Sequence, residues 1–116
     1  MDRDLQRIYR IKCYCEDILE AVEYLGRDYN EYLSNKHYAN SISLSLLQIG
    51  EHFGSVTEEF KDAHRKDVPW VAIRGMRNRL AHSYDDMDKK YIWESAVTDI
   101  PMILAFCERV LTTEAM

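Results

Sequence analysis

The amino-acid sequence predicts an all-α protein, a single-domain up-down bundle of four to five helices that spans residues 1–116. Long stretches carry apolar residues at steps of three and four, which is the pattern of helices with one buried face. Helix breakers are rare, with four glycines and two prolines in 116 residues. No stretch alternates apolar and polar residues as a half-buried strand does. A chain of this length forms one domain.

The first helix is expected from about Arg3 to Leu25, and Gly26 provides its C-terminal stop. Its apolar stripe comprises Leu5, Ile8, Ile11, Cys15, Ile18, Val22 and Leu25. Residues 27–33 are expected to form a polar, aromatic connector. Ser34 is a suitable cap for a second helix that reaches about Phe53. The stripe of that helix comprises Tyr38, Ile42, Leu46, Ile49 and Phe53.

Three further helices are expected in the second half of the chain. Ser55 and Glu58 form a capping-box pattern at the start of a short third helix. Pro69 suits the first turn of a fourth helix. The last helix begins near Lys89, and Pro101 should kink or restart it, because proline lacks the backbone N–H that an α-helix needs there.

Composition and charge limit the classes of function. The three cysteines, Cys13, Cys15 and Cys107, are an odd number and are expected to be reduced thiols rather than disulfides or metal ligands. No signal-like or membrane-spanning apolar stretch is found, so we expect a cytoplasmic protein without a membrane partner. The net charge of −5 disfavours indiscriminate nucleic-acid binding, and no DNA partner is expected.

The charge is nevertheless uneven along the chain. Residues 63–84 contain five Lys and Arg against one Asp, a balance of +4, whereas residues 91–116 have a balance of −3. A basic strip on an acidic body is either a local binding site for a phosphate backbone or an ordinary solvated helix face. Charge alone leaves both interpretations open.

The segment with the densest set of reactive side chains is residues 73–84, IRGMRNRLAHSY. RNA cleavage without a metal ion needs a group that takes a proton from the 2′-hydroxyl, and histidine, here His82, does this at neutral pH. It also needs a cation beside the crowded phosphorus, and Arg77 supplies one in a forked geometry. Asn78 is placed to support either residue. Metal ligation is not expected, because no second histidine or acidic pair lies one turn from His82.

The spacing within this segment leaves alternatives open. On an unbroken helix, the side chains of Arg77 and His82 would lie about 140° apart. They converge if the helix ends before His82, or if a two-fold dimer joins two copies of the segment. Equally, these residues form no more than a helix cap and a surface hydrogen-bond network. Trp70 and Trp93 are expected in packing rather than in base stacking.

This segment resembles the signature of the HEPN superfamily, in which a polar residue follows an Arg and a His stands four to six positions further on. Arg77, Asn78 and His82 fit that pattern. Tyr84, two residues beyond the His, resembles the HepT branch in particular. Residues 46–54, LLQIGEHFG, and residues 68–88 look like the two motifs of that branch.

The resemblance implies a metal-independent endoribonuclease toxin, without a cofactor, of a type VII-like toxin–antitoxin pair. Arg77 and His82 would be catalytic at a cleft between the protomers of a homodimer, with Asn78 supporting them. The partner would be a nucleotidyltransferase antitoxin of the MNT type, which silences the toxin by adding AMP to Tyr84. Added bulk and a phosphodiester anion two residues from His82 would compete with RNA for Arg77.

Some candidate residues have two interpretations. Glu51 either orients Arg77 in the cleft or is a solvated helix acid. Arg74 and Arg79 are candidates for binding RNA phosphates, although Arg79 also suits a solvent-facing role. The acidic stretch at residues 85–88 would repel an RNA backbone unless it points away or faces the partner.

Two other functions remain open from the sequence. The chain is alternatively a non-catalytic subunit that binds a nucleotide or a nucleotidyltransferase partner, with Tyr84 as a modification site only. A purely structural helical adaptor is a third possibility, in which Arg77 and His82 would be replaceable. Surface or packing roles are expected for the remaining histidines, His37, His52 and His64.

Overall fold

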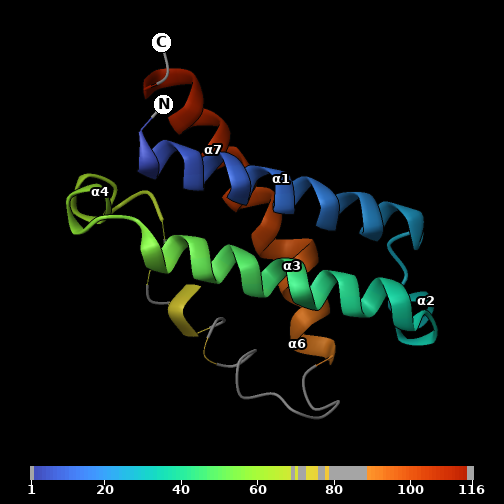
Figure 1. The fold of residues 1–116 in the computed structure, drawn as a ribbon. Helices are drawn as coiled ribbons and strands as arrows, with labels where there is room; N and C mark the ends of the chain where they lie inside the picture. The colour runs from blue at the N-terminus through green and yellow to red at the C-terminus, as the bar shows by residue number, and fades with distance from the viewer. Residues whose placement is uncertain (1, 69, 71–72, 76–77, 79–88, 115–116) are drawn as a thin grey trace.

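The computed structural model describes residues 2–68, 70, 73–75, 78 and 89–114, and all its regular elements are helical (Figure 1). The helices are α1 (Arg3–Tyr24), α2 (Tyr29–Ser34), α3 (Lys36–Ser55), α4 (Glu58–Ala63), α6 (Lys89–Glu94), the π-helical η2 (Ser95–Asp99) and α7 (Ile100–Glu114). The described residues between α4 and α6 that are helical are Trp70, Ile73, Arg74, Gly75 and Asn78, here called the 70–78 segment. The predicted all-α class is confirmed.

Helices α1 and α3 lie side by side in opposite directions, and α7 packs against α1 from behind (Figure 1). The apolar stripes expected from the sequence form the centre of this core. The most deeply buried large side chains are Tyr32, Phe53, Ile8, Ile11, Ile18, Ile42, Leu46, Ile49 and Ile100. No helix among the described residues has the length and apolar character needed to cross a membrane.

Both ends of α1 are defined by local interactions. At its start, the Asp2 carboxylate accepts a hydrogen bond of 2.8 Å from the backbone N–H of Leu5. At its end, Gly26 has a φ of 67° and Arg27 a φ of 56°, so two successive residues are in the left-handed region. Glycine adopts this region without a steric penalty, and it ends helices for that reason. The predicted stop at Gly26 is confirmed.

The expected connector at residues 27–33 is wrong, because most of it forms helix α2. The Asp28 carboxylate accepts a hydrogen bond of 2.8 Å from the N–H of Asn30 and starts this helix. Tyr32 is then buried, with its ring stacked 5.0 Å from that of Trp93 in α6. A single buried tyrosine carries no visible apolar period, so the periodicity of the sequence did not reveal the helix. Trp93 is a packing residue, as expected.

The expected caps of the next two helices are also wrong by one or two residues. Ser34 is the last residue of α2, and its hydroxyl donates to the carbonyl of Asn30. Asn35 caps α3 instead, accepting from the N–H of Tyr38 at 3.3 Å. Ser55 likewise ends α3 rather than capping α4.

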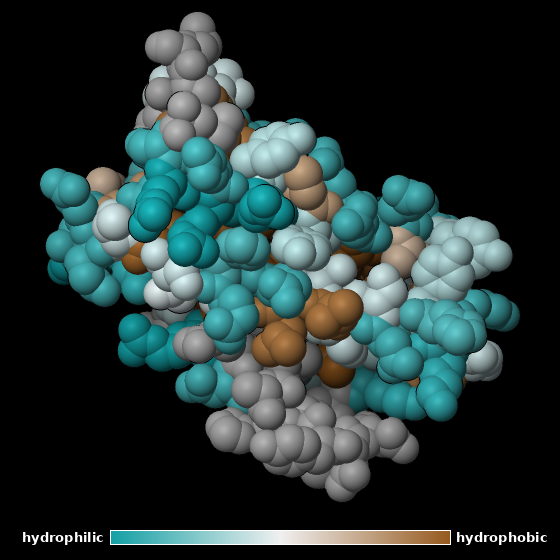
Figure 2. Space-filling model, in the orientation of Figure 1, coloured by the Kyte–Doolittle hydropathy of each residue, from teal (hydrophilic) through white to brown (hydrophobic). Residues whose placement is uncertain are grey.

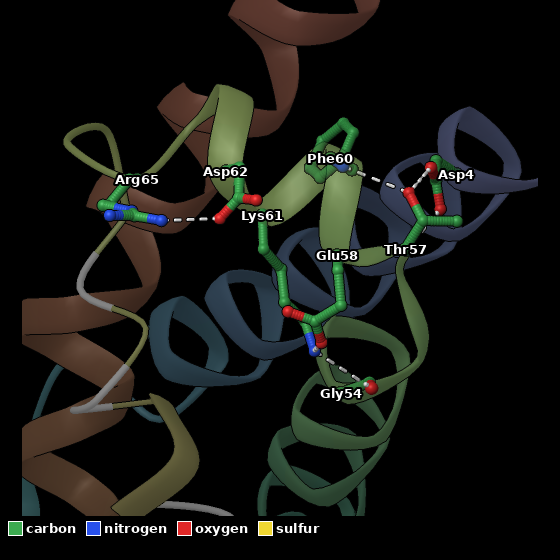
Figure 3. Close-up of polar contacts among 8 residues, drawn as sticks. All are labelled: Asp4, Gly54, Thr57, Glu58, Phe60, Lys61, Asp62 and Arg65. Carbon is green, nitrogen blue, oxygen red and sulfur yellow. Dashed lines mark hydrogen bonds and ion pairs between the residues drawn. The ribbon is translucent and has the colours of Figure 1, made fainter.

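The cap of α4 is Thr57, and it also joins α4 to α1 (Figure 3). Its hydroxyl oxygen accepts from the N–H of Phe60 at 3.1 Å. The same hydroxyl donates to one oxygen of the Asp4 carboxylate at 2.7 Å, and the N–H of Thr57 donates to the other at 3.0 Å. Asp4 therefore holds the start of α4 against the first turn of α1.

Thr57→Ala is expected to lower the free energy of unfolding by about 1–2 kcal/mol, because it removes a helix cap together with one bond to Asp4. Urea denaturation followed by circular dichroism measures the change. Thr112→Ala is the matched control, since Thr112 is exposed in α7 and its loss should cost less than about 0.5 kcal/mol. Equal losses in both variants would contradict the role of the cap.

The C-terminal helix is interrupted where the sequence predicts, just before Pro101. Helix α6 passes into η2, and the N–H of Ile100 bonds to the carbonyl of Ser95, five residues back. Pro101 follows directly, as the second residue of α7. The backbone at Glu94 and Ile100 stays helical, so the helix continues through the π-helical turn and does not restart as a separate helix.

All three cysteines are free. Burial raises the pKa of the Cys15 thiol and raises that of Cys107 to about 12. Buried, protonated thiols are poor nucleophiles and poor metal ligands. Cys15 and Cys107 therefore act as small apolar residues of the core.

Candidate functional site

Most of the residues to which the sequence assigns chemistry lie outside the described residues. These are the catalytic pair Arg77 and His82, the AMP acceptor Tyr84, the candidate phosphate ligand Arg79 and the acidic stretch at 85–88. The described part of the site consists of the 70–78 segment and the helices that it packs against.

The 70–78 segment is anchored to α3 and α4 by its apolar side. The Trp70 indole meets the Phe53 ring edge-on, with 5.4 Å between ring centroids, and its Nε1 donates to the carbonyl of His64 at 3.2 Å. Ile73 is buried, and its neighbour Arg74 is exposed. Trp70 therefore acts in packing, as expected. The opposite side of the segment, with Arg74 and Asn78, faces solvent.

Gly75 has no close neighbour that would explain a glycine inside this segment. A Cβ built at Gly75 meets no atom within 4 Å. A glycine inside a helix costs about 1 kcal/mol relative to alanine, and the described residues show no close contact at Gly75 that requires one.

A cavity of about 50 Å³ lies between α3, α4 and the 70–78 segment. The described residues that line it are Gly50, Phe53, Gly54, Lys61, Trp70, Ile73 and Arg74, and we call it the cationic cavity. Two glycines one turn apart on α3 leave room on that side. Lys61 and Arg74 are the charged residues of this lining, and both are cations.

Lys61 projects from α4 toward the end of α3 (Figure 3). Its Nζ lies 3.5 Å from the carbonyl oxygen of Gly54 and 3.4 Å from a carboxylate oxygen of Glu58. The Lys61 side chain is 23% exposed, whereas that of Glu58 is 86% exposed. No pattern in the sequence selects Lys61, because the approach of Lys61 to the 70–78 segment depends on how α4 folds back on α3.

The basic strip of residues 63–84 is partly neutralised where the structure describes it. Arg65 forms an ion pair with Asp62 at 2.7 Å (Figure 3), and His64 lies 3.1 Å from Asp67. Arg74 is the described cation of the strip that lines the cationic cavity. Lys66, a further described cation of the strip, is exposed and is not among the described lining residues of this cavity.

The outer face of α3 carries the other candidate residue. Glu51 is exposed, and Leu44, seven residues before it and about 20° away around the helix, is 59% exposed. Figure 2 shows a hydrophobic patch near the middle of this view, with hydrophilic residues above it and to its left. The structure places Glu51 on this face.

The remaining histidines have the surface and packing roles expected of them. His37 is exposed, whereas His64 packs against the rings of Phe60 and Phe106. His52 lies between α3 and α1, with Nδ1 3.5 Å from the Arg7 guanidinium. Burial, helped by the charge of Arg7, lowers the pKa of His52 below its usual value. Among the described residues, no three His, Cys, Asp or Glu side chains are grouped to hold a metal ion.

Comparison with known proteins places these features in a family. The model of a family described as "Ribonuclease HepT-like" matches residues 11–110, which include the motif segment and the lining of the cationic cavity. The chain belongs to the HepT-like ribonuclease family. The resemblance found in the motif segment is thus confirmed at the level of the family.

Relatives of this HepT-like protein match most of its length. "Putative RNase TTE0752" of Caldanaerobacter subterraneus subsp. tengcongensis is 31% identical over 106 residues, which cover 87% of this chain and 94% of the relative. "Probable ribonuclease HepT" of Thermococcus cleftensis is 29% identical over 104 residues, covering 85% and 94%. No solved structure gives a significant match.

Proposed function

We propose that this protein is a metal-independent endoribonuclease toxin that cleaves RNA with Arg77 and His82. The observation that carries the proposal is the family match over residues 11–110, within which the sequence has the Arg77, Asn78 and His82 pattern. The relatives are named as RNases. The cationic cavity beside the 70–78 segment supports the same substrate, because an RNA backbone needs cations there.

The proposed reaction is a transesterification within the RNA. His82 takes the proton of a 2′-hydroxyl, and the oxygen attacks the adjacent phosphorus. The bond from phosphorus to the 5′-oxygen breaks, that oxygen receives a proton, and a 2′,3′-cyclic phosphate remains. Arg77 stabilises the negative charge on the phosphorus oxygens in the transition state. Asn78 supports the pair through hydrogen bonds.

We propose a homodimer in which two copies of the motif face one cleft. One histidine then removes the proton while the histidine of the second copy supplies the proton to the leaving oxygen. The outer face of α3 suits this contact, because Leu44 is a large exposed apolar residue on the same face as Glu51. In this arrangement Glu51 orients Arg77, and Arg74 and Arg79 bind RNA phosphates.

The proposed regulator is a nucleotidyltransferase antitoxin of the MNT type, which transfers AMP to the hydroxyl of Tyr84. Tyr84 stands two residues from His82 in the sequence. A nucleotide there adds bulk and an anion that competes with RNA for Arg77. The pair would form a type VII-like toxin–antitoxin system.

His82→Ala is expected to reduce the RNA cleavage rate by about 10²–10⁴-fold, the contribution of a general acid–base residue. The chain is expressed alone from a tight promoter, beside His82→Ala and the control His37→Ala, whose histidine is exposed on α3. Growth and total RNA on a gel are followed. Growth arrest with RNA fragments is expected for wild type and His37→Ala only.

Two outcomes would contradict this proposal. Cleavage that persists in purified His82→Ala, free of contaminating nuclease, would remove His82 from the mechanism. Intact RNA and normal growth with a soluble wild-type protein, unmodified at Tyr84, would favour the non-catalytic subunit that binds a nucleotidyltransferase.

A further inference from the structure

We propose that Lys61, together with Arg74, binds a phosphodiester group of the RNA backbone at the mouth of the cationic cavity. This inference rests on the proposed function, because it assumes that RNA is the substrate. It adds a residue from outside the motif segment to the RNA-binding surface.

The charge of the cavity lining is the first argument. Lys61 from α4 and Arg74 from the 70–78 segment both line the same small cavity, and none of its described lining residues is acidic. An anion at the mouth of the cavity would therefore have two cations available to it. Phosphate oxygens are the usual partners of Arg and Lys in nucleic-acid complexes.

The contacts of Lys61 leave its ammonium group available to such an anion. Both of its described partners lie near the outer limit for hydrogen bonds, at 3.5 Å for the Gly54 carbonyl and 3.4 Å for Glu58 (Figure 3). An ammonium group has three donors, so these two contacts do not use its full capacity. The Glu58 side chain is 86% exposed, and such surface ion pairs are weak. A phosphate therefore competes with Glu58 at little cost.

The size of the cavity selects the part of the RNA that it accepts. A volume of about 50 Å³ has room for about three to five water molecules at roughly 10–15 Å³ each. A phosphate group fits such a space at its mouth, whereas a nucleobase does not fit within it. The Trp70 indole is held by Phe53 and by the carbonyl of His64, so it forms a wall rather than a stacking platform. The cavity thus binds backbone and not base.

The position of Arg74 connects this phosphate with the proposed chemistry. Arg74 and Asn78 are both helical residues of the described part of the motif segment, and in the sequence Arg77 stands beside Asn78. A phosphate held by Lys61 and Arg74 would fix the register of the RNA relative to the motif. Lys61 is therefore a positioning residue for the proposed reaction.

RNA affinity tests the inference separately from cleavage. Variants are made in the His82→Ala protein, and binding of a short fluorescent single-stranded RNA is measured by anisotropy between roughly 50 and 200 mM salt. Lys61→Gln is expected to weaken binding about three- to tenfold and to reduce the slope of log Kd against log salt by about 0.7, as for one lost phosphate contact. Lys61→Arg should keep the affinity.

Two matched variants sharpen the result. Glu58→Gln removes the carboxylate that competes for Lys61, and it should tighten RNA binding about two- to fivefold. A purely structural Lys61–Glu58 pair predicts no such gain. Lys36→Gln is the control for net charge, because Lys36 is an exposed residue at the opposite end of α3. The RNA affinity of this variant should stay within about twofold of that of the parent.

The outcomes separate this inference from the function on which it rests. If the parent binds RNA and Lys61→Gln binds it equally well, the role of Lys61 is overturned, but the proposed function is not. The same holds if Lys36→Gln weakens RNA binding as much as Lys61→Gln does. If Lys61→Gln loses helical circular dichroism, its weaker RNA binding would not by itself show a phosphate contact. Glu58→Gln then decides, because an RNA affinity unchanged from the parent in Glu58→Gln also overturns the role of Lys61. If the parent binds no RNA and wild type cleaves none, the proposed function fails together with the inference.

Discussion

Phe53→Ala is expected to lower the free energy of unfolding by about 3–5 kcal/mol, the usual cost of removing a buried phenylalanine. Phe53 is 1% exposed and contacts two other aromatic rings, those of Trp70 at 5.4 Å and Phe106 at 6.3 Å between centroids. It therefore joins α3 to the 70–78 segment and to α7. Its removal would also merge the space that it fills with the cationic cavity.

Urea denaturation at one fixed protein concentration measures this effect, because the proposed dimer makes stability depend on concentration. Met102→Ala is the comparison, since Met102 is 50% exposed in α7 and has no role in the proposed dimer contact. Its loss should change stability by less than about 0.5 kcal/mol. A loss below about 1 kcal/mol in Phe53→Ala would mean that the ring is not part of the core.

Tyr84→Phe is expected to abolish silencing by an MNT-type nucleotidyltransferase while leaving RNA cleavage close to the wild-type rate. In the proposed transfer, the phenolic oxygen attacks the α-phosphorus of ATP, its proton is lost and pyrophosphate leaves. Phenylalanine has no oxygen to accept the nucleotide. The size and ring of the side chain stay the same, so RNA should still reach Arg77 and His82.

The measurement is RNA cleavage before and after incubation with the nucleotidyltransferase and ATP, together with the intact mass of the protein. Tyr91→Phe is the control, because Tyr91 is a half-buried tyrosine of α6 outside the motif. Wild type and Tyr91→Phe should gain the mass of AMP and lose activity. Silencing of Tyr84→Phe to the same degree would show that another residue is the acceptor.

The long helices could be predicted from the sequence because each buries a continuous apolar stripe. Every residue of the stripe expected for α1 is buried, and α1 ends beside Gly26 as its composition indicates. The same reasoning missed α2, whose core contact is Tyr32 alone. The sequence signal for α2 is local. Asp28 and Glu31 have the three-residue spacing of a capping box, with an aspartate at the cap position where that pattern usually has Ser or Thr.

The cap of α4 and the site depend on contacts between distant residues, and these contacts have no signature in a single sequence. Ser55 and Thr57 are both reasonable caps for α4, and it is the carboxylate of Asp4 that favours Thr57. Lys61 likewise reaches the 70–78 segment only because α4 folds back over the end of α3. The motif segment itself was found from its residue types, and the family match confirms that resemblance.

The π-helical turn at Ser95–Asp99 has a consequence for comparing this chain with its relatives. A π-turn holds one residue more than an α-turn without rotating the helix on either side of it. Buried residues lie on both sides of the turn, with Ile92 and Trp93 before it and Ile100 and Ile103 after it. A homologue with one residue fewer here can form an ordinary α-helix in place of the π-helical turn. Alignments of the family should therefore tolerate a single-residue gap in this turn.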